Sequence, residues 1–269
     1  MPTALVTGAS AGLGAAFTRR LALEHHDLIL VARDAVRLNE QAEKLRAEHG
    51  TEVEVLPADL TVDEDCERVE RRLADPDRPV HVLVNNAGVG LNSSFVEADI
   101  AEEEKLLRLN VRAVMRLTHA VLPQMLARRK GDVINVSSVS GFGPAQPGAT
   151  YSATKAYVIN FSESIAAGVK GYGVRVVALC PGYTRTEFHQ RAGINIQPIP
   201  AKAWLNADDV VREGLHDLRR GKSVSVPSVR YKVVVAAMRH LPHGLVKRLT
   251  RDTRGRIKQA PKGGDGTRR

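Results

Sequence analysis

The sequence predicts a doubly wound α/β fold, in which helices cover both faces of a parallel sheet of about seven strands. Seven short runs rich in valine, isoleucine and leucine alternate along the chain with longer stretches whose apolar residues recur at helical intervals. Several of these runs are apolar throughout, as a strand covered on both faces should be. Alternation at this spacing is typical of βαβ units, and βαβ units produce parallel sheets.

The expected elements follow one another without a linker up to about residue 228. Amphipathic helices are expected to begin near residue 13 and to cover 34–49, 99–128 and 151–170. A chain of 269 residues is long enough for these elements to share one core, so we expect one domain over residues 1–227. The runs that we expect to form strands are residues 3–7, 27–32, 51–58, 80–85, 132–137, 174–179 and 223–227.

Composition narrows the class of protein. Hydrophobic residues make up 43% and charged residues 26%, which is typical of globular rather than disordered chains. The two cysteines, Cys66 and Cys180, form no CxxC motif, which argues against a disulfide framework and favours a reducing, cytoplasmic setting. The start MPTALVTGAS enters a strand pattern at once, so we expect no signal peptide, and no apolar run is long enough to span a bilayer. The histidines show no metal-ligand spacing, and we expect no metal.

A glycine-rich turn follows the first expected strand. The stretch TGASAGLG places Gly8, Gly12 and Gly14 in a GxxxGxG pattern directly before the first helix. Glycines allow a tight turn there and let a pyrophosphate approach the backbone N–H groups at the helix N-terminus. The position predicts a nucleotide site that also includes Ser10 and Leu13, with a plain structural turn as the alternative.

The end of the second expected strand indicates which nucleotide is bound. An acidic residue at this point suits the ribose 2′-hydroxyl of NAD, whereas an arginine suits the 2′-phosphate of NADP. The strand ends LVARD, with Arg33 at the position of the acid and Asp34 one residue later. Neighbours on an extended segment point opposite ways, and Arg33 is the better placed of the two. We therefore expect NADP(H) to be favoured over NAD(H), unless Arg33 is merely a solvated strand end.

Two further turns lie at the same expected edge of the sheet. NNAG, which includes Asn86, Ala87 and Gly88, follows the fourth strand and would let the backbone lie close to a ligand. Asp59 and Leu60 follow the third strand. The Asp59 carboxylate could accept a hydrogen bond from an adenine amine, but a helix N-cap or turn role is equally compatible with the sequence.

Six motifs now stand in order along the chain: TGASAGLG, NNAG, Asn110 in LRLNV, Ser138 in INVSSVSG, YSATK and CPGYTRT. Over residues 3–226 the sequence resembles the short-chain dehydrogenase/reductase family, whose members have a single Rossmann-fold domain. The resemblance implies an NADP(H)-dependent oxidoreductase that transfers a hydride between nicotinamide and a carbonyl or secondary alcohol. It also implies four catalytic residues, which are Asn110, Ser138, Tyr151 and Lys155.

The implied roles fit the chemistry of these side chains. Tyr151 and Lys155 lie one helical turn apart and share a face, so the ammonium could lower the pKa of the phenol, which would act as acid and base. By the resemblance, Lys155 also binds the nicotinamide ribose, Ser138 rather than its neighbour Ser137 holds the substrate oxygen, and Asn110 positions a water. The loop CPGYTRT would close over the nicotinamide, with contacts from Pro181, Gly182 and Thr184.

Two segments outside these motifs remain open to several interpretations. Residues 187–206 would form the substrate lid, and their apolar side chains indicate either a lipophilic or bulky substrate or a lid packed on its own core. Residues 228–269 hold 12 lysines and arginines and 2 acidic residues, so we expect a basic, partly helical extension with a disordered tail. Its helical part, 231–249, could cap the pocket, lie on an anionic membrane, or be solvated. The lack of interleaved aromatic residues argues against nucleic-acid binding.

The function itself has alternatives on the same fold. A nucleotide sensor or scaffold could keep the fold without the chemistry, although both Tyr151 and Lys155 are retained. A C=C reductase or an epimerase is a second alternative. The resemblance further implies a homodimer or homotetramer that assembles through the two long helices, 99–128 and 151–170.

Overall fold

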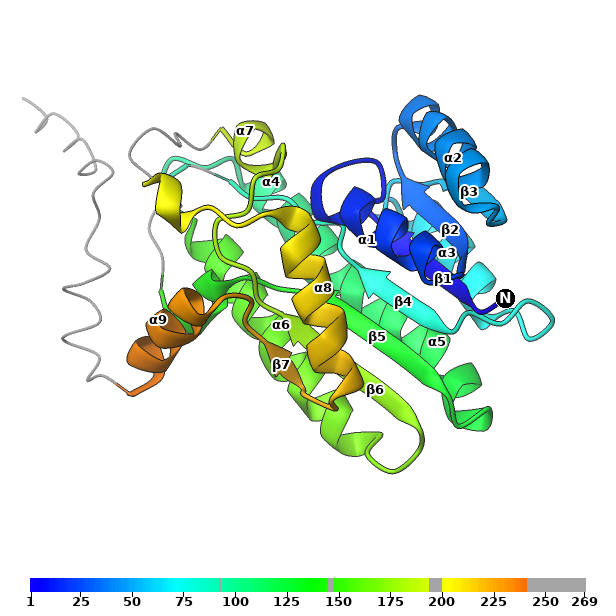
Figure 1. Ribbon diagram of the computed structural model, residues 1–269. Helices are drawn as coiled ribbons and strands as arrows, with labels where there is room; N and C mark the ends of the chain where they lie inside the picture. The colour runs from blue at the N-terminus through cyan, green and yellow to red at the C-terminus, as the bar shows by residue number, and fades with distance from the viewer. Residues whose placement is uncertain (92, 145–147, 194–199, 241–269) are drawn as a thin grey trace, which may run out of the picture.

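The computed structural model describes residues 1–91, 93–144, 148–193 and 200–240 (Figure 1). Two of the expectations above therefore lie outside the described residues: the tail of the C-terminal extension and the part of the lid between residues 194 and 199. Within the described residues, no helix is both long enough and apolar enough to cross a bilayer. In the same part of the chain, no three His, Cys, Asp or Glu side chains come together in a group that could hold a metal ion.

Seven parallel strands form one sheet in the order β3-β2-β1-β4-β5-β6-β7, which confirms the predicted fold class. The alternation of Leu5 and Val6 shows why the strands are apolar throughout, since one side chain enters the core on each face of the sheet. The edge strand β7 is shorter than the run expected at 223–227. The strands are β1 (Thr3–Thr7), β2 (Asp27–Ala32), β3 (Val53–Pro57), β4 (Val82–Asn85), β5 (Gly131–Val136), β6 (Val174–Leu179) and β7 (Val224–Ser225).

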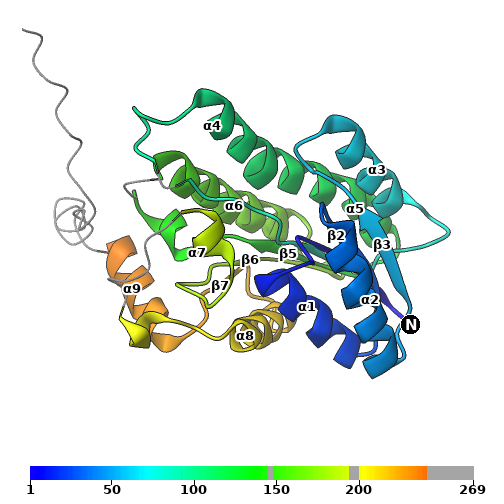
Figure 2. The ribbon, with the colours of Figure 1, turned by 90° about the horizontal axis from the view of Figure 1, so that it is seen from above.

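Helices cover both faces of the sheet, as Figure 2 shows from above. The apolar sides of α1 (Gly12–Leu23), α2 (Ala35–His49) and α8 (Ala207–Arg219) join one core. The second core holds residues of α3 (Asp63–Ala74), α5 (Val114–Ala127) and α6 (Ala149–Gly168). Smaller helical elements are the short α7 (Phe188–Arg191), α9 (Val229–His240) and the 3₁₀ turns η2 (Val139–Phe142) and η3 (Ala201–Ala203).

The expected long helix over residues 99–128 is interrupted. It consists of α4 (Ile100–Leu107), six residues of π-helix, η1 (Arg108–Ala113), and then α5. A π-helical turn inside a longer helix is rare and frequently lies at a functional site. The candidate residue Asn110 is in this turn.

A chain of polar side chains crosses the otherwise apolar sheet. Asn85 on β4 and Asn135 on β5 are direct neighbours in register, and the Asn85 amide nitrogen donates to the Asn135 amide oxygen at 2.9 Å. Asn85 also donates to the Thr118 hydroxyl on α5 at 3.1 Å, and Asn135 donates to the Ser162 hydroxyl on α6 at 2.9 Å. All four residues are buried, so these bonds satisfy groups that water cannot reach.

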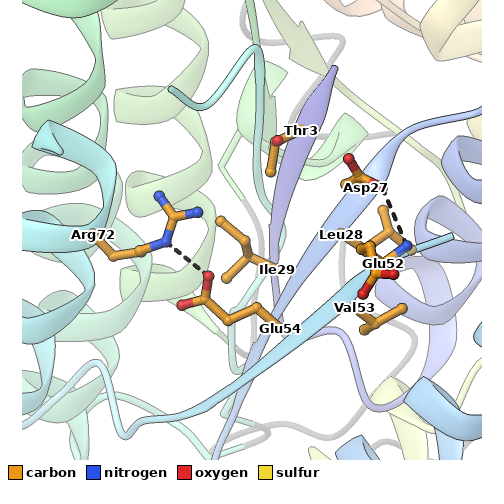
Figure 3. Close-up of a pocket in the computed structure, with 8 residues that line it drawn as sticks. All are labelled: Thr3, Asp27, Leu28, Ile29, Glu52, Val53, Glu54 and Arg72. Carbon is orange, nitrogen blue, oxygen red and sulfur yellow. Dashed lines mark hydrogen bonds and ion pairs between the residues drawn. The ribbon is translucent and has the colours of Figure 1, made fainter. Parts of the chain in front are cut away.

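The strand order determines which loops meet. The chain leaves the sheet at the edge strand β3 and returns beside β1 as β4, so the loops after β1 and β4 lie next to each other. Open α/β sheets bind ligands at the carboxyl ends of their strands near such a reversal. A hollow of about 250 Å³ lies at the other end of the strands, near the first residues of β1, β2 and β3 (Figure 3). An ion pair of 2.8 Å between Arg72 and Glu54 closes part of this hollow, which is remote from the candidate residues.

Candidate active site

The glycine loop after β1 has the conformation that its sequence requires. Gly8 and Gly12 have φ values of +65° and +56°, in the left-handed region that favours glycine. A Cβ on Gly14 would lie 2.0 Å from the Gly8 carbonyl oxygen, so only glycine fits there. Ala11, the N-cap of α1, gives no side-chain bond to the helix, and the first turn has no acidic residue. Backbone N–H groups and the positive end of the helix dipole are therefore available to a phosphate.

The loop after β4 is bonded to the end of β1. The Thr7 hydroxyl oxygen accepts hydrogen bonds from the backbone N–H groups of Asn86 (2.9 Å) and Ala87 (3.0 Å), and the Asn86 amide donates to the Thr7 carbonyl at 2.9 Å. These bonds hold Gly88 beside two candidate catalytic residues. A Cβ on Gly88 would lie 3.2 Å from Asn110 Oδ1 and 3.5 Å from Lys155 Nζ.

Asn110 joins the π-helical turn to this loop. Its amide nitrogen donates to the Val89 carbonyl at 2.9 Å, and its amide oxygen accepts from the Val89 N–H at 3.0 Å. A longer contact of 3.3 Å leads to the Thr154 hydroxyl on α6. Since both polar ends of its amide are paired with Val89, Asn110 fixes the NNAG loop in the protein alone. Its role in positioning a water stays a prediction.

The two serines after β5 have different partners. Ser137 is buried, and its hydroxyl donates to the Lys155 carbonyl at 2.7 Å, which ties β5 to α6. Ser138 accepts from the Ser140 N–H at 3.2 Å, and its hydroxyl lies near enough to the Tyr151 phenol to lower the pKa of that group. The geometry therefore favours Ser138 over Ser137 as the serine that works with Tyr151.

Tyr151 and Lys155 share one face of α6, as their spacing predicts, but the phenol is less acidic than expected. Burial raises the pKa of Tyr151 to about 12, and the hydrogen bond from Ser138 offsets only part of that rise. Burial also lowers the pKa of Lys155 to about 8. The Lys155 ammonium donates to the Val136 carbonyl at 2.9 Å and lies 5.6 Å from the centroid of the Tyr151 ring. The expected lowering of the phenol pKa is therefore not found in the protein alone, because burial raises this pKa by more than Ser138 lowers it.

Arg33 extends into solvent at the end of β2, with a side chain that is 66% exposed. Its guanidinium lies 3.8 Å from the carboxylate of Asp59, after β3. Asp34 is the N-cap of α2 and accepts from the Arg37 N–H at 3.1 Å. The Asp34 carboxylate is therefore used to cap α2. Of the two charged side chains at this strand end, Arg33 is the one that can face a ribose phosphate.

Asp59 adopts the turn role, one of its two expected interpretations. One carboxylate oxygen accepts from both the N–H (3.0 Å) and the hydroxyl (2.7 Å) of Thr61. Although burial opposes the charge, these bonds and the nearby Arg33 hold the pKa of Asp59 below its ordinary value. Leu60 is buried in the core beneath the turn.

The described part of the lid places one aromatic ring beside Tyr151, and its other rings pack on the loop after β6. Phe188, at the start of α7, has its ring centroid 5.8 Å from that of Tyr151. Trp204 lies 5.0 Å from His189 and 5.8 Å from Tyr183, so the lid packs on the loop after β6. The lid therefore packs on its own core, which was one of its two expected interpretations, and it also presents one ring to the site. A lipophilic or bulky substrate stays a prediction.

The remaining predicted cofactor contacts lie in or beside these loops. Pro181 accepts a backbone hydrogen bond of 3.0 Å from Val139, which follows Ser138, and the Thr184 hydroxyl donates to the Gly182 carbonyl at 3.0 Å. Ser10 lies in the glycine turn between β1 and α1, and Leu13 is the second residue of α1. The structure thus brings the loops after β1, β4, β5 and β6 to one edge of the sheet, and Arg33 and Asp59 lie at the ends of the adjoining strands β2 and β3.

One residue beside the site was not among the predicted site residues. Tyr231 of α9 lies against Gly182, and in the sequence it is only an aromatic residue in a basic, amphipathic segment. No motif or spacing identifies it. Its contacts support the first of the three interpretations of segment 231–249 for the residues up to 240, whereas residues 241–249 lie outside the described part of the chain. Contact with a membrane stays a prediction.

Comparison with known proteins gives a consistent result. The chain matches the family model described as short chain dehydrogenase over residues 2–196. It is 31% identical to ketoacyl reductase HetN of a Nostoc species over 214 residues, which cover 76% of this chain and 74% of that protein. A solved short-chain dehydrogenase from Sphingobium yanoikuyae, in complex with NADPH, is 37% identical and has a TM-score of 0.82, with 98% of this chain and 99% of that chain covered.

A second solved structure is a bulky-bulky ketone specific alcohol dehydrogenase from Comamonas testosteroni. It is 32% identical with a TM-score of 0.77, and the match covers 97% of this chain and 99% of that chain. The family model spans most of the chain, and the match covers nearly the full length of the two solved structures and about three quarters of HetN. This protein therefore belongs to the short-chain dehydrogenase/reductase family and is an oxidoreductase.

Proposed function

We propose that this protein transfers a hydride between NADP(H) and a carbonyl or secondary alcohol, with Tyr151 as the acid and base. One observation carries the proposal. The buried ammonium of Lys155 lies 5.6 Å from the centroid of the Tyr151 ring, and the Ser138 hydroxyl lies near enough to the phenol to lower its pKa. A phenol, a hydroxyl and a cation in this arrangement can hold a carbonyl oxygen and exchange a proton with it.

The pKa values suggest the direction in which each group works. A phenol with a pKa of about 12 keeps its proton at neutral pH and can donate it to the oxygen of a ketone. Lys155, with a pKa of about 8, is mainly protonated at pH 7, so its charge can stabilise the phenolate that remains. A bound dinucleotide would supply the hydride. In the oxidative direction the phenolate would take the proton of the alcohol.

Three features support NADP(H) as the favoured cofactor. Arg33 is exposed at the end of β2, Asp34 is used as an N-cap, and the solved Sphingobium relative is in complex with NADPH. The backbone N–H groups of the glycine loop and of the α1 N-terminus would hold the pyrophosphate. Gly14 keeps this turn tight, because a Cβ there would collide with the backbone of Gly8. A guanidinium can form two parallel hydrogen bonds with the 2′-phosphate of NADP. The 2′-hydroxyl of NAD cannot accept such a pair of bonds.

We propose a bulky, largely apolar carbonyl compound as the substrate. Phe188 presents an aromatic ring beside Tyr151, and a Cβ on Gly90 would lie 3.1 Å from the Phe188 ring. An aromatic wall of this kind favours apolar substituents on the carbonyl carbon. The Comamonas relative is named for bulky-bulky ketones, which agrees with this choice. For assembly, we propose pairing through α5 and α6, where Met115 and the stacked rings of Tyr157 and Phe161 are partly exposed.

The test compares Tyr151→Phe with wild type in the reduction of a panel of aryl ketones followed by NADPH absorbance. Loss of a general acid should lower turnover by about 10²- to 10⁴-fold, while NADPH binding, measured by fluorescence, stays within a few-fold. Tyr172→Phe, at an exposed site in the turn between α6 and β6, is the matched control and should be unchanged. Full turnover by Tyr151→Phe would exclude the acid/base role. A wild type that binds NADPH but reduces nothing would favour the sensor or scaffold.

A further inference from the structure

Helix α9 contacts three segments that border the candidate active site. The guanidinium of Arg239 lies 4.8 Å from the ring centroid of Phe142, at the end of the 3₁₀ turn that follows Ser138. Val235 is buried in a small core with residues of α6, β6 and the end of β7. Tyr231 reaches the loop after β6. Figure 1 shows α9 at this end of the sheet, beside α6 and β7.

Tyr231 joins two of these segments through its hydroxyl group. The hydroxyl accepts a hydrogen bond from the Tyr183 N–H at 3.1 Å, in the loop after β6, and donates one to the Ala203 carbonyl at 2.8 Å, in the described part of the lid. Its ring lies on Gly182 so closely that a Cβ there would be 2.0 to 2.3 Å from three ring carbons. Gly182 is therefore required by the tyrosine above it, in addition to any contact with a cofactor.

Both segments that Tyr231 joins contact residues next to the candidate catalytic side chains Ser138 and Tyr151. The loop Pro181–Thr184 is bonded to Val139 next to Ser138. Ala203 precedes Trp204, whose ring packs on that of His189. The residue before His189 is Phe188, whose ring lies beside that of Tyr151. A shift of either segment would move the wall of the site relative to Tyr151. A tyrosine that bonds both at once fixes their distance.

We propose that Tyr231 is a positioning residue, which holds the loop after β6 and the lid in the arrangement that orders the nicotinamide end of the site. The inference rests on the proposed function, because the cofactor contacts of the loop belong to it. The residue acts through backbone groups of the loop and the lid and does not touch the reacting atoms. A displacement of about 1 Å at a reacting centre is enough to lower a rate severalfold or more.

The chain offers a specific probe for this arrangement. Trp204 is the only tryptophan in the sequence, and it directly follows the carbonyl group that Tyr231 binds. Acrylamide quenching of its fluorescence in the cofactor-free protein therefore reports on the lid without any turnover. Tyr231→Phe keeps the ring on Gly182 and removes only the hydroxyl, and Tyr172→Phe is the control with the same chemical change at an exposed position.

Tyr231→Phe should make Trp204 measurably easier to quench. With NADPH and a ketone it should lower kcat by roughly tenfold, as expected when partly buried hydrogen bonds are left unmade. The dissociation constant of NADPH should change by less than about threefold, because the glycine loop and Arg33 hold the other end of the molecule. Tyr172→Phe should match wild type in all three measurements. Thermal melts identify any variant that fails to fold, in which case Tyr231→Met, which also lacks the hydroxyl, replaces it.

Each outcome decides the inference. Unchanged quenching, or a changed quenching with an unchanged kcat, overturns the positioning role. A fall in kcat that is matched by an equal weakening of NADPH binding also overturns it, since that result indicates general loosening. If wild type reduces no carbonyl compound at all, the proposed function fails, and the quenching experiment still shows whether Tyr231 holds the lid.

Discussion

Replacing Lys155 with methionine should change how the stability of the protein depends on pH. The Lys155 side chain is only 5% exposed, and burial lowers its pKa from 10.5 to about 8. A lysine with a depressed folded-state pKa destabilises the fold at low pH, where it is charged in both states. The cost disappears as the pH rises from about 8 to 10.5, because the folded state loses its proton first.

The magnitude follows from the two pKa values. Between pH 7 and pH 10 the linkage relation gives wild type a gain in unfolding free energy of about 2.5 kcal/mol from this one group. Lys155→Met lacks this gain. At pH 7 the variant avoids burying a charge but loses the ammonium hydrogen bond to Val136, worth about 1.5 to 3 kcal/mol, so the two effects nearly cancel.

Urea denaturation at both pH values, followed by circular dichroism, measures the difference between variant and wild type. We expect the variant to fall behind wild type by about 2.5 kcal/mol more at pH 10 than at pH 7. Lys170→Met, at an exposed lysine after α6, should show no such change. If the difference for Lys155→Met is the same at both pH values, the charge is not buried as the structure has it, and the reasoning is refuted.

Three further changes test other parts of the structure. Arg33→Ala should raise the KM for NADPH by roughly tenfold or more and leave that for NADH unchanged, and an equal effect on both would contradict the phosphate role. Gly14→Ala should lower the unfolding free energy by about 2 kcal/mol or more, because the new methyl group meets backbone, whereas Gly168→Ala meets nothing within 4 Å and should not destabilise. Arg37 and Glu187, each 47% exposed, form an ion pair of 3.1 Å between α2 and the lid. A double-mutant cycle on this pair should give a coupling below about 1 kcal/mol, and a larger value would mean that it is shielded from water.

The strands and their order along the chain could be predicted, because burial on both faces gives each strand a continuous run of apolar residues. The run at 174–179 coincides with β6, and the run at 27–32 coincides with β2. The end strand is the exception, since only Val224 and Ser225 pair with β6 out of the run at 223–227. An apolar run shows that a segment is buried but does not show how many of its residues find a partner strand.

The interruption around Asn110 could not be predicted from helical periodicity. The apolar residues of 99–128 continue at helical intervals through the π-helical turn, so the pattern gives no sign of the extra residue. The turn is associated with the paired bonds between Asn110 and Val89, which are contacts between segments far apart along the chain.

The spacing of Tyr151 and Lys155 correctly predicted that the two side chains lie close together, but it did not predict their pKa values. Spacing determines which side chains share a helix face, whereas a pKa depends on how much water remains around the group after folding. The contacts of Tyr231 could not be predicted either. Its role as a bridge depends on where α9 docks, and no local pattern in a basic segment encodes that position.

The paired amides of Asn85 and Asn135 have a consequence for how the chain finds its native alignment. If β4 slid along β5 by one residue, Asn85 would lie beside Ile134 or Val136 and lose its bond to Asn135, at a cost of several kcal/mol in a dry interior. Slipped pairings of these two strands are thereby penalised while the sheet assembles. Because NNAG begins at Asn85 and the two serines follow Val136, the same penalty fixes the register at which the loops after β4 and β5 leave the sheet.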